Sequence, residues 1–273
     1  MEPSSSTIEP AIGQSRLVSL SRLEKAPWWS LGLALVWLWV FYSILNVNVY
    51  HDAFVFISEG IGLTVRIAVS AYLIAVSLGL VLGLGRVSKN IVIYNLAMMY
   101  VEVIRGLPML IIVLYGAYVV VPAIENLLTN FFPDLSLAGL DDSMRGAIGL
   151  GLGYAAFEAE IFRAGIQSIE RGQMEAARSL GMSYAQAMRY IILPQAIRRI
   201  LPPLGNDLIS ILKDSSLVSA LAVRELTQMA KLNRGRTFLS LESYNTVAFF
   251  YLTMTLFLSM VVKFVERRLK IER

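Results

Sequence analysis

The chain has 273 residues, of which 56% are hydrophobic and only 16% are charged, a composition too apolar for most water-soluble domains of this size. Its net charge of +4 is too small to indicate a nucleic-acid partner by itself. It has no cysteine and one histidine, which excludes disulfides and thiolate chemistry and argues against histidine-based metal sites. We therefore predict an integral membrane protein without a metal site.

The first apolar segment follows a polar tail. Residues 1–27 are rich in Ser and Pro and end in a basic stretch, and we interpret them as a cytoplasmic tail. Residues 28–45 form an uncharged run that is longer than the core of a signal peptide and lacks a small-residue cleavage site. This pattern predicts a retained transmembrane helix.

Two longer apolar stretches come next. Residues 61–85 predict a second span, in which Gly79 and Gly83 would allow another helix to approach closely. Residues 91–121 predict a third span, and Pro108 predicts a bend within it. Residues 122–143 contain acidic side chains and no Lys or Arg, which predicts an acidic outer loop.

The remaining apolar stretches predict three more spans, at residues 144–166, 197–221 and 244–262. Gly149 and Gly153 repeat the small-residue spacing in the first of these. Six spans place both termini on one side of the membrane, and that side receives sixteen basic residues against four on the other. The positive-inside rule therefore predicts cytoplasmic termini. The four outer basic residues, which oppose the rule, are Arg224, Lys231, Arg234 and Arg236.

A polar segment at about 170–190 separates the fourth and fifth spans. Residues 173–180 predict a short helix, with Glu175 in its first turn and Gly181 placed to end it. An S-x-x-Q capping box at 183–186 predicts a second short helix, after which Pro194 should bend the chain. The pattern indicates a compact helix–Gly–helix element rather than a slack linker.

This segment resembles a known family. The run Glu175-Ala176-Ala177, then Gly181, then Ile192-Leu193-Pro194 is similar to the EAA signature of permease subunits of bacterial ATP-binding-cassette (ABC) importers. The polar amino-acid uptake branch is resembled by the blocks AEIFRAGIQSIERGQMEAARSLGMS, ILPQAIRRILPPLGN and LKDSSLVSALAVREL. The RGLP segment at 105–108 resembles that branch's RGTP, with Leu107 in place of Thr.

The resemblance implies an all-α integral membrane protein with six transmembrane helices. Five would form the permease core over residues 60–266, and the helix at 28–45 would be an extra N-terminal one, with 267–273 as a cytoplasmic tail. The protein would lie in the bacterial cytoplasmic membrane and import polar amino acids by alternating access. It would be a transport subunit and not an enzyme.

The resemblance also implies partners. These would be two cytoplasmic ABC ATPases, a second permease subunit (a copy or a paralogue), an extracytoplasmic solute-binding protein, the polar amino-acid substrate and the lipid bilayer. ATP and Mg²⁺ would be bound by the ATPases, because this chain has no phosphate-binding loop of the G-x-x-x-x-G-K-[ST] type. The chain itself would bind no cofactor and no nucleic acid.

The coupling of transport to ATP hydrolysis would be carried by the short helix at 173–180. The family pattern assigns the docking role to Gly172, Glu175, Ala176, Ala177 and Gly181. Small side chains would permit close docking, and the carboxylate of Glu175 could pair with a basic groove of the ATPase. From spacing alone, the acid and the glycine could equally be the caps of an ordinary surface helix.

Charged residues inside the spans form a second group of candidates, since buried charges need a partner or a polar cavity. Glu102 with Arg105, and Glu160 with Arg163, are each three residues apart and predict structural ion pairs. Glu158 lies about 200° around the helix from Glu160, so it needs another environment. It either lines a cavity where it could hold the ammonium of an amino acid or has a structural role.

The fifth span carries the remaining candidates for the substrate path, Asp207, Lys213, Asp214, Ser215 and Ser216. Asp207 and Asp214 are seven residues apart and share a helix face. An internal Lys–Asp network and a direct contact with substrate are both consistent with this spacing.

Other functions fit the residues less well. A permease for methionine or an osmolyte is the main alternative, but the blocks quoted above favour the amino-acid branch. A secondary transporter should show large internal repeats, and none is found. A membrane-embedded enzyme would need a nucleophile or metal constellation, and no such motif is recognisable.

Overall fold

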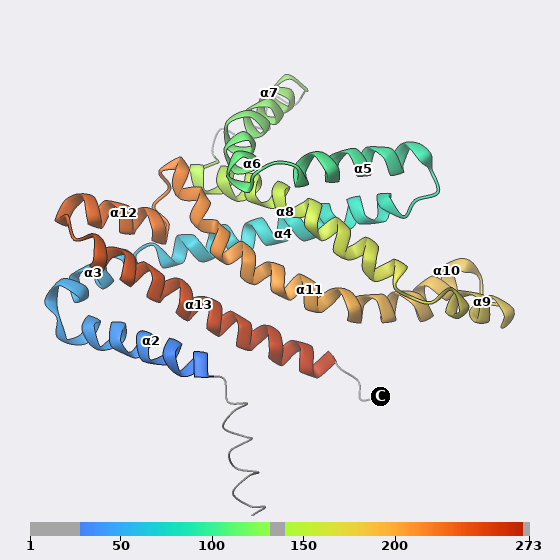
Figure 1. The fold of residues 1–273 in the computed structure, drawn as a ribbon. Coiled ribbons are helices and arrows are strands. Elements are labelled where there is room, and N and C mark those ends of the chain that lie inside the picture. The colour runs from blue at the N-terminus through green and yellow to red at the C-terminus, as the bar shows by residue number, and fades with distance from the viewer. Residues whose placement is uncertain (1–27, 132–139, 270–273) are drawn as a thin grey trace, which may run out of the picture.

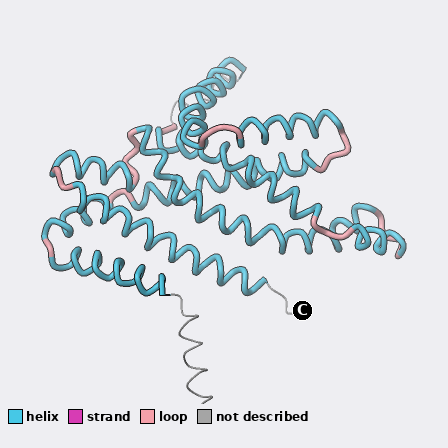
Figure 2. The backbone as a smooth tube through the Cα atoms, in the orientation of Figure 1, coloured by secondary structure: helices cyan, strands magenta, loops and turns pink. Residues whose placement is uncertain are grey.

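The computed structural model describes residues 28–131 and 140–269. Within these two ranges every regular element is a helix and no strand is present (Figure 2). The expectation of an all-α protein is therefore confirmed. The predicted tails at 1–27 and 270–273 lie outside the described residues.

The N-terminal helices form a bent pair. Helix α2 (Trp28–Asn46) and helix α3 (Asn48–Ser58) meet at an angle of 99°. Helix α2 packs on the last helix, α13 (Ser240–Leu269), through stacked rings of Trp37, Phe41 and Phe249. The indole Nε1 of Trp37 also donates a hydrogen bond to Thr253 at 3.0 Å. Helix α2 is thus attached to α13.

The predicted bend within the third apolar stretch is confirmed. The chain breaks at the expected place: helix α5 (Ile91–Arg105) ends before Pro108, and helix α6 (Met109–Tyr115) begins after it. The predicted outer loop is wrong in its first part, because α7 (Val121–Phe131) is helical. The helix runs on from the preceding π-helical turn into α7, so Pro122 does not end it. Residues 132–139 of that loop lie outside the described residues.

Two short π-helical segments each precede a proline. Segment η1 (Gly116–Val120) ends with the amide of Val121 bonded to Gly116, just before Pro122. Segment η2 (Met188–Ile192) ends in the same way, with Leu193 bonded to Met188 just before Pro194. The wider π turn accommodates the proline ring, so the helix continues where the sequence suggests a bend.

The centre of the fold is the packing of α4 (Ile61–Arg86) against α8 (Asp142–Gln167). A Cβ added at Gly83 would lie 2.7 Å from the Cβ of Phe162, and one at Gly79 would overlap the Cβ of Glu158. A Cβ at Gly149 would lie 2.6 Å from the carbonyl oxygen of Val113 in α6. The predicted close approach at both glycine pairs is confirmed.

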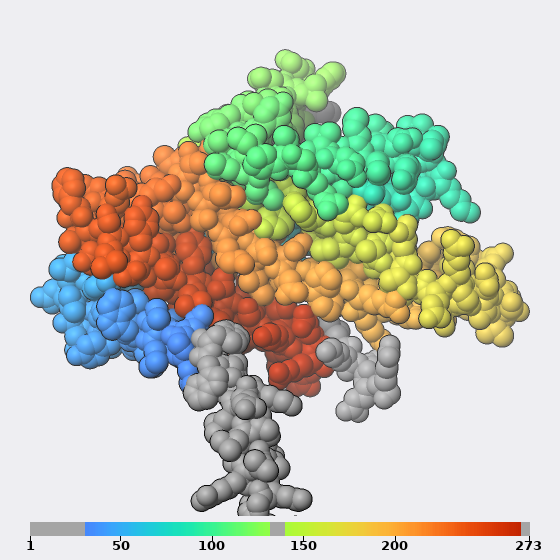
Figure 3. All heavy atoms as spheres, in the orientation of Figure 1, coloured from blue at the N-terminus to red at the C-terminus, as the bar shows by residue number. Residues whose placement is uncertain are grey.

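Helix α11 (Leu193–Asp214) packs on α4, α8 and α13 and continues into the 3-10 segment η3 (Ser215–Leu221). Helices α9 (Arg171–Ser179) and α10 (Tyr184–Ala187) lie at one end of the fold. Helix α12 (Leu226–Thr237) lies with α3 at the opposite end (Figure 1). The space-filling view shows α9 and α10 projecting beyond the other helices (Figure 3).

Three helical stretches are long and apolar enough to cross a membrane: Ile61–Arg86, Met109–Phe131 and Ser240–Arg268. The bent α2–α3 pair would make a fourth. Helices α8 and α11 carry more polar and charged residues, so length and composition alone do not identify them as spans.

Candidate functional site

The polar element between α8 and α11 has the helix–Gly–helix form that its sequence predicts. Gly181 follows α9 with φ of +83°, a conformation that glycine adopts at low cost. The amide of Met182 donates to the carbonyl of Ala177 at 3.2 Å, and that of Gly181 to Arg178 at 3.0 Å. These two bonds form a Schellman motif, which satisfies the last carbonyls of α9.

Helix α10 begins with the predicted capping box. The hydroxyl of Ser183 accepts from the amide of Gln186 at 3.2 Å, and the Gln186 side chain accepts from the Ser183 amide at 2.8 Å. Local hydrogen bonds therefore end α9 and start α10. Its shape depends little on distant parts of the chain.

Only one side of α9 is buried. Ala177 is buried, whereas Glu175 and Ala176 are exposed, and Gly172 and Gly181 have no atom within 4 Å of an added Cβ. The surface also exposes large apolar side chains: Leu180 is 84% exposed and Tyr184 is 61% exposed. Such a cluster at a projecting tip is typical of a docking surface.

Neither Leu180 nor Tyr184 was among the residues predicted for this surface. The sequence carries no signal for them, because apolar residues in a short amphipathic element are normally expected to face inward. Only their exposure in the folded chain shows that they point away from the fold.

The element is joined to α11 by side-chain contacts. The amide of Gln195 donates to the side-chain oxygen of Gln173 at 3.4 Å, and Arg199 donates to the carbonyl of Ser168. An apolar cluster of Met174, Met188 and Ile192 with α8 and α11 lies beneath α9. A force on α9 would therefore reach α11 directly.

The inner end of α8 carries an ion cluster. Arg163 donates to Glu160 through Nε at 2.9 Å, as the spacing predicts, and to Gln167 through Nη1 at 2.8 Å. Glu160 also pairs with Arg86 at the end of α4, whose side chain is 8% exposed. The sequence did not single out Arg86, because its partner Glu160 lies far along the chain.

The predicted ion pair between Glu102 and Arg105 is absent. Both side chains are exposed on α5, and neither forms an ion pair with any described residue. Arg105 instead lies over the ring of Phe157, 5.8 Å from its centroid. Spacing of three residues permits a pair, but an exposed one contributes little and competes with such contacts.

Acidic side chains of α8 and α11 converge inside the fold. Glu158 is fully buried, and neither of its oxygens has a hydrogen-bond partner among the described residues. The hydroxyl of Tyr154, one turn away, donates to Asp214 at 2.8 Å. Asp207 of α11 is the nearby acidic residue whose carboxyl group can interact with that of Glu158. An unpartnered carboxylate in such a place is a candidate for binding a cation.

The predicted internal Lys–Asp network does not form. Lys213 is exposed and makes no ion pair with a described residue, so it leaves the carboxylates of Asp207 and Asp214 without a basic partner. The hydroxyl of Ser215 donates to the carbonyl of Leu212 at 2.8 Å, and Ser216 is half-buried. The hydroxyl of Ser215 therefore satisfies a backbone carbonyl at the end of α11.

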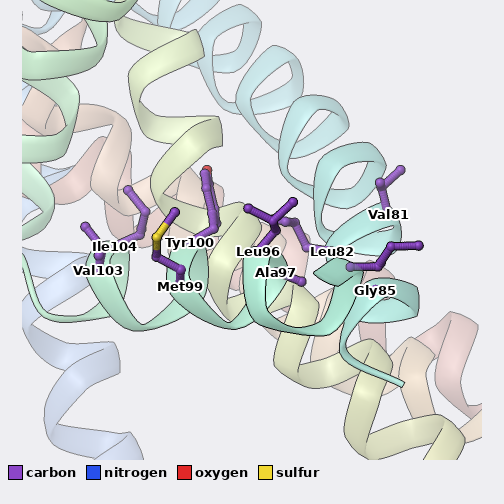
Figure 4. A pocket seen from close by; sticks show the side chains of 10 residues that line it. Val81, Leu82, Gly85, Leu96, Ala97, Met99, Tyr100, Val103 and Ile104 are labelled. Carbon is purple, nitrogen blue, oxygen red and sulfur yellow. The ribbon is translucent and has the colours of Figure 1, made fainter. Parts of the chain in front are cut away.

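An apolar groove of about 540 Å³ lies between α4 and α5, away from these acidic groups (Figure 4). It is lined by Val81, Leu82, Gly85, Ile93, Leu96, Ala97, Met99, Tyr100, Val103 and Ile104. It has no charged side chain, so it offers nothing to hold an amino-acid ammonium or carboxylate. Its chemistry suits the hydrocarbon of a membrane.

Comparison with known proteins finds membrane components of transport systems. A family model described as "binding-protein-dependent transport system inner membrane component" matches residues 75–271. The probable glutamine ABC transporter permease protein GlnM of Bacillus subtilis is 37% identical over 228 residues, which covers 83% of this chain and 99% of GlnM. The glutamine transport system permease protein GlnP of Escherichia coli is 36% identical over 213 residues, covering 78% of this chain and 92% of GlnP.

Solved structures share the fold. The structure described as an amino acid ABC transporter with histidines matches with a TM-score of 0.68 and 37% identity, covering 82% of this chain and 98% of that one. The MetNI methionine ABC transporter, in an inward-facing conformation, matches with a TM-score of 0.61 and 18% identity, over 78% and 96% of the two chains.

Proposed function

The chain belongs to the family of binding-protein-dependent transport system inner membrane components, and we propose that it is the permease subunit of an ABC importer that moves polar amino acids into a bacterial cell. Relatives that carry amino-acid names match it over most of their length. The methionine transporter is similar at 18% identity, which supports the common fold and not methionine as substrate. The chain is thus a transport component.

The observation that carries this proposal is the projecting α9–α10 element. It exposes Glu175, Ala176 and Leu180 at one end of the molecule and is tied to α11 through Gln173. We propose that this surface docks in a groove of a cytoplasmic ABC ATPase. The small residues Gly172, Ala177 and Gly181 would permit close docking, and Gly181 would also end α9. Glu175 would pair with a basic residue of the partner.

ATP and Mg²⁺ would be bound by the partner ATPases and not by this chain. Closure of two ATPases on ATP would displace α9, and α11 would follow through its contacts with α9 and η2. The complete importer would contain two ATPases, a second permease subunit and an extracytoplasmic solute-binding protein. The permease core would span residues 60–266.

Six membrane crossings remain part of the proposal. Helix α8 has 26 residues, so it is about 39 Å long, and it lies along α4, which is long and apolar enough to span. Its charged side chains face protein: Glu158 is fully buried and Glu160 is paired with Arg86. Low hydropathy is expected of a helix that is surrounded by other helices, and the same argument applies to α11.

The orientation follows from charge. The end that carries α9 and α10 would be cytoplasmic, with both termini on that side, because it carries most of the basic residues. The chain would then cross the cytoplasmic membrane six times.

The acidic groups between α4, α8 and α11 are the proposed substrate path. Glu158 would hold the ammonium of the amino acid, since its carboxylate is buried without a partner. Asp207, Asp214 and Ser216 would line the path beside it. Lys213 and Ser215 are weaker candidates, because Lys213 faces outward and the hydroxyl of Ser215 is bonded within its helix.

Coexpression with an ATPase subunit tests the function. The wild-type chain should copurify as a complex of two membrane subunits and two ATPases, and the complex should take up a labelled polar amino acid in vesicles. Glu175→Lys and Gly181→Asp should lose both copurification and uptake. Full assembly and full transport by both variants would contradict the coupling role.

A separate variant tests the substrate path. Glu158→Gln keeps the side-chain volume but removes the charge, so it should leave assembly intact and weaken the affinity for substrate. Measuring uptake against substrate concentration separates affinity from maximal rate. Unchanged affinity would assign Glu158 a structural role without affecting the coupling proposal.

A further inference from the structure

The break between α5 and α6 places a charged side chain deep in the proposed membrane region. Arg105 is the last residue of α5, which begins at Ile91, so it lies about 21 Å along the helix. In the proposed orientation α5 begins at the cytoplasmic surface, and the hydrocarbon core of a membrane is about 30 Å thick. A guanidinium group at that depth is costly in lipid and needs a partner or a polar cavity.

The backbone holds the end of α5 in place. The amide of Gly106 donates to the carbonyl of Glu102 at 3.1 Å, and Pro108 is extended, with φ of −61° and ψ of 136°, before α6 begins. Helices α5 and α6 both pack on α8 (Figure 1). The position of Arg105 is therefore set before any ligand arrives, which lowers the entropic cost of binding.

The guanidinium group of Arg105 has no acidic partner in the described parts of the chain. Its side chain is exposed, and it forms no ion pair with Glu102 or with any other residue of 28–131 and 140–269. Its Cζ lies 5.8 Å from the centroid of the Phe157 ring on α8. The face of an aromatic ring attracts a cation but leaves the planar set of N–H donors available to an anion.

The ring of Phe157 leads from this cation towards acidic side chains. It is 39% exposed and lies 5.9 Å from the ring of Tyr154, whose hydroxyl donates to Asp214 at 2.8 Å. Glu158, buried without a hydrogen-bond partner in the described chain, directly follows Phe157 on α8. A cation and carboxylates therefore flank one pair of aromatic rings, which matches the two opposite charges of a zwitterion.

We propose that Arg105 binds the α-carboxylate of the transported amino acid, with the substrate lying over the ring of Phe157. The inference rests on the proposed function, in which Glu158 holds the ammonium group. A guanidinium group offers two parallel N–H donors to a carboxylate, and such a bidentate pair is strong and orienting. Every α-amino acid carries this carboxylate, so Arg105 recognises the part of the substrate that is independent of its side chain.

The test measures binding to the complex of this chain with its ATPase in nanodiscs, without the solute-binding protein. The probes are labelled L-glutamine and L-arginine, and the competitors are the matching amines that lack the carboxylate, 4-aminobutanamide and agmatine. Arg105→Gln should bind both amino acids at least about tenfold more weakly than wild type, because their carboxylate loses its partner. It should bind the amines as wild type does, which a merely structural role would not produce.

Two further variants make the result specific. Arg105→Lys keeps the charge but not the bidentate geometry, so it should assemble and show a smaller loss for the amino acids alone. Glu158→Gln should weaken binding of amino acids and amines alike, because both carry the ammonium group. The matched control is Arg66→Gln on α4, an exposed arginine near the opposite end of that span, which should bind every probe as wild type does.

The outcomes separate this inference from the proposed function. An equal loss for amino acids and amines in both Arg105 variants overturns the inference and makes Arg105 structural. Unchanged binding in both variants overturns it as well, and assigns the guanidinium group to the second permease subunit or to lipid. A wild-type complex that binds neither amino acid, with or without the solute-binding protein, overturns the proposed function itself.

Discussion

Glycines shape both the α4–α8 interface and the α9–α10 element, but for different physical reasons. At the interface, Gly79 and Gly83 remove side chains so that two helices can touch. In the element, Gly181 has open space around it and is needed for its backbone angle, φ of +83°. The first use is steric and belongs to the buried core, and the second is conformational and belongs to an exposed turn. The interface should therefore control whether the protein folds. The element should control whether the folded protein couples transport to ATP hydrolysis by the partner.

The largest effect is expected at Gly79. A Gly79→Leu side chain would overlap Glu158, so α4 and α8 would have to separate, at a cost of several kcal/mol on the scale of overpacked cores. We expect loss of monodisperse protein in size-exclusion chromatography. The control is Gly62→Leu on the same helix, where nothing lies within 4 Å of an added Cβ, and it should behave as wild type. Equal behaviour of the two variants would contradict the steric role.

The ion cluster at the inner end of this interface should come next. Glu160→Gln would leave Arg86, 8% exposed, without its anionic partner, and should reduce the free energy of unfolding by roughly 3 kcal/mol. Thermal melting in detergent measures this. Glu102→Gln is the matched control, because Glu102 is exposed and forms no ion pair with a described residue, and its melting temperature should not change. A melting temperature lowered equally by both variants would disprove the special role of the cluster.

The turn after α9 should respond more mildly. Gly181→Ala adds one methyl group in open space and places a Cβ at positive φ, which costs about 1–2 kcal/mol. We expect faster hydrogen exchange in α9 and weaker coupling, with an unchanged melting temperature for the whole protein. Gly172→Ala, also in open space but at an ordinary helical angle, should slow exchange in α9 instead. Faster exchange in both variants would show that the backbone angle is not the cause.

The smallest effect is expected at the opposite end of α8. The amide of Met144, the hydroxyl of Ser143 and the charge of Arg66 hold the pKa of Asp141 below its ordinary value of 3.8. A lowered pKa means that the ionised group stabilises the fold above about pH 4, and that this contribution is lost as the pH falls through the folded pKa. Asp141→Asn keeps an N-cap but cannot titrate, so its melting temperature should vary less between pH 5 and pH 3. An identical pH dependence in wild type and variant would contradict this.

Local patterns were readable from the sequence wherever neighbours along the chain decide the structure. The Ser183–Gln186 capping box, the helix end at Gly181 and the break at Pro108 are all as predicted. The same holds for the glycine pairs, because small residues at four-residue spacing leave a groove that another helix can fill. The motif that carries the proposed coupling role is likewise short and local.

Long-range features were not readable in this way. Arg86 and Glu160 are distant in sequence, and only the packing of α4 on α8 brings them together. Of the pairs that spacing suggested, Glu160 with Arg163 is made, whereas Glu102 with Arg105 and Lys213 with its acidic neighbours are not, because an exposed charge gains little from an ion pair in water. Spacing shows which contacts are possible and does not rank them.

The sequence by itself determined that the chain is an all-helical membrane protein of the permease family, because hydrophobic runs, caps and short motifs are local properties. The tertiary structure decided what each charge faces: the unpartnered Glu158, the Arg86–Glu160 pair and Arg105 over the ring of Phe157. The physical reason is that burial and pairing of a charge depend on the elements packed around it. Those elements, α4, α8, α11 and α13, come from distant parts of the chain.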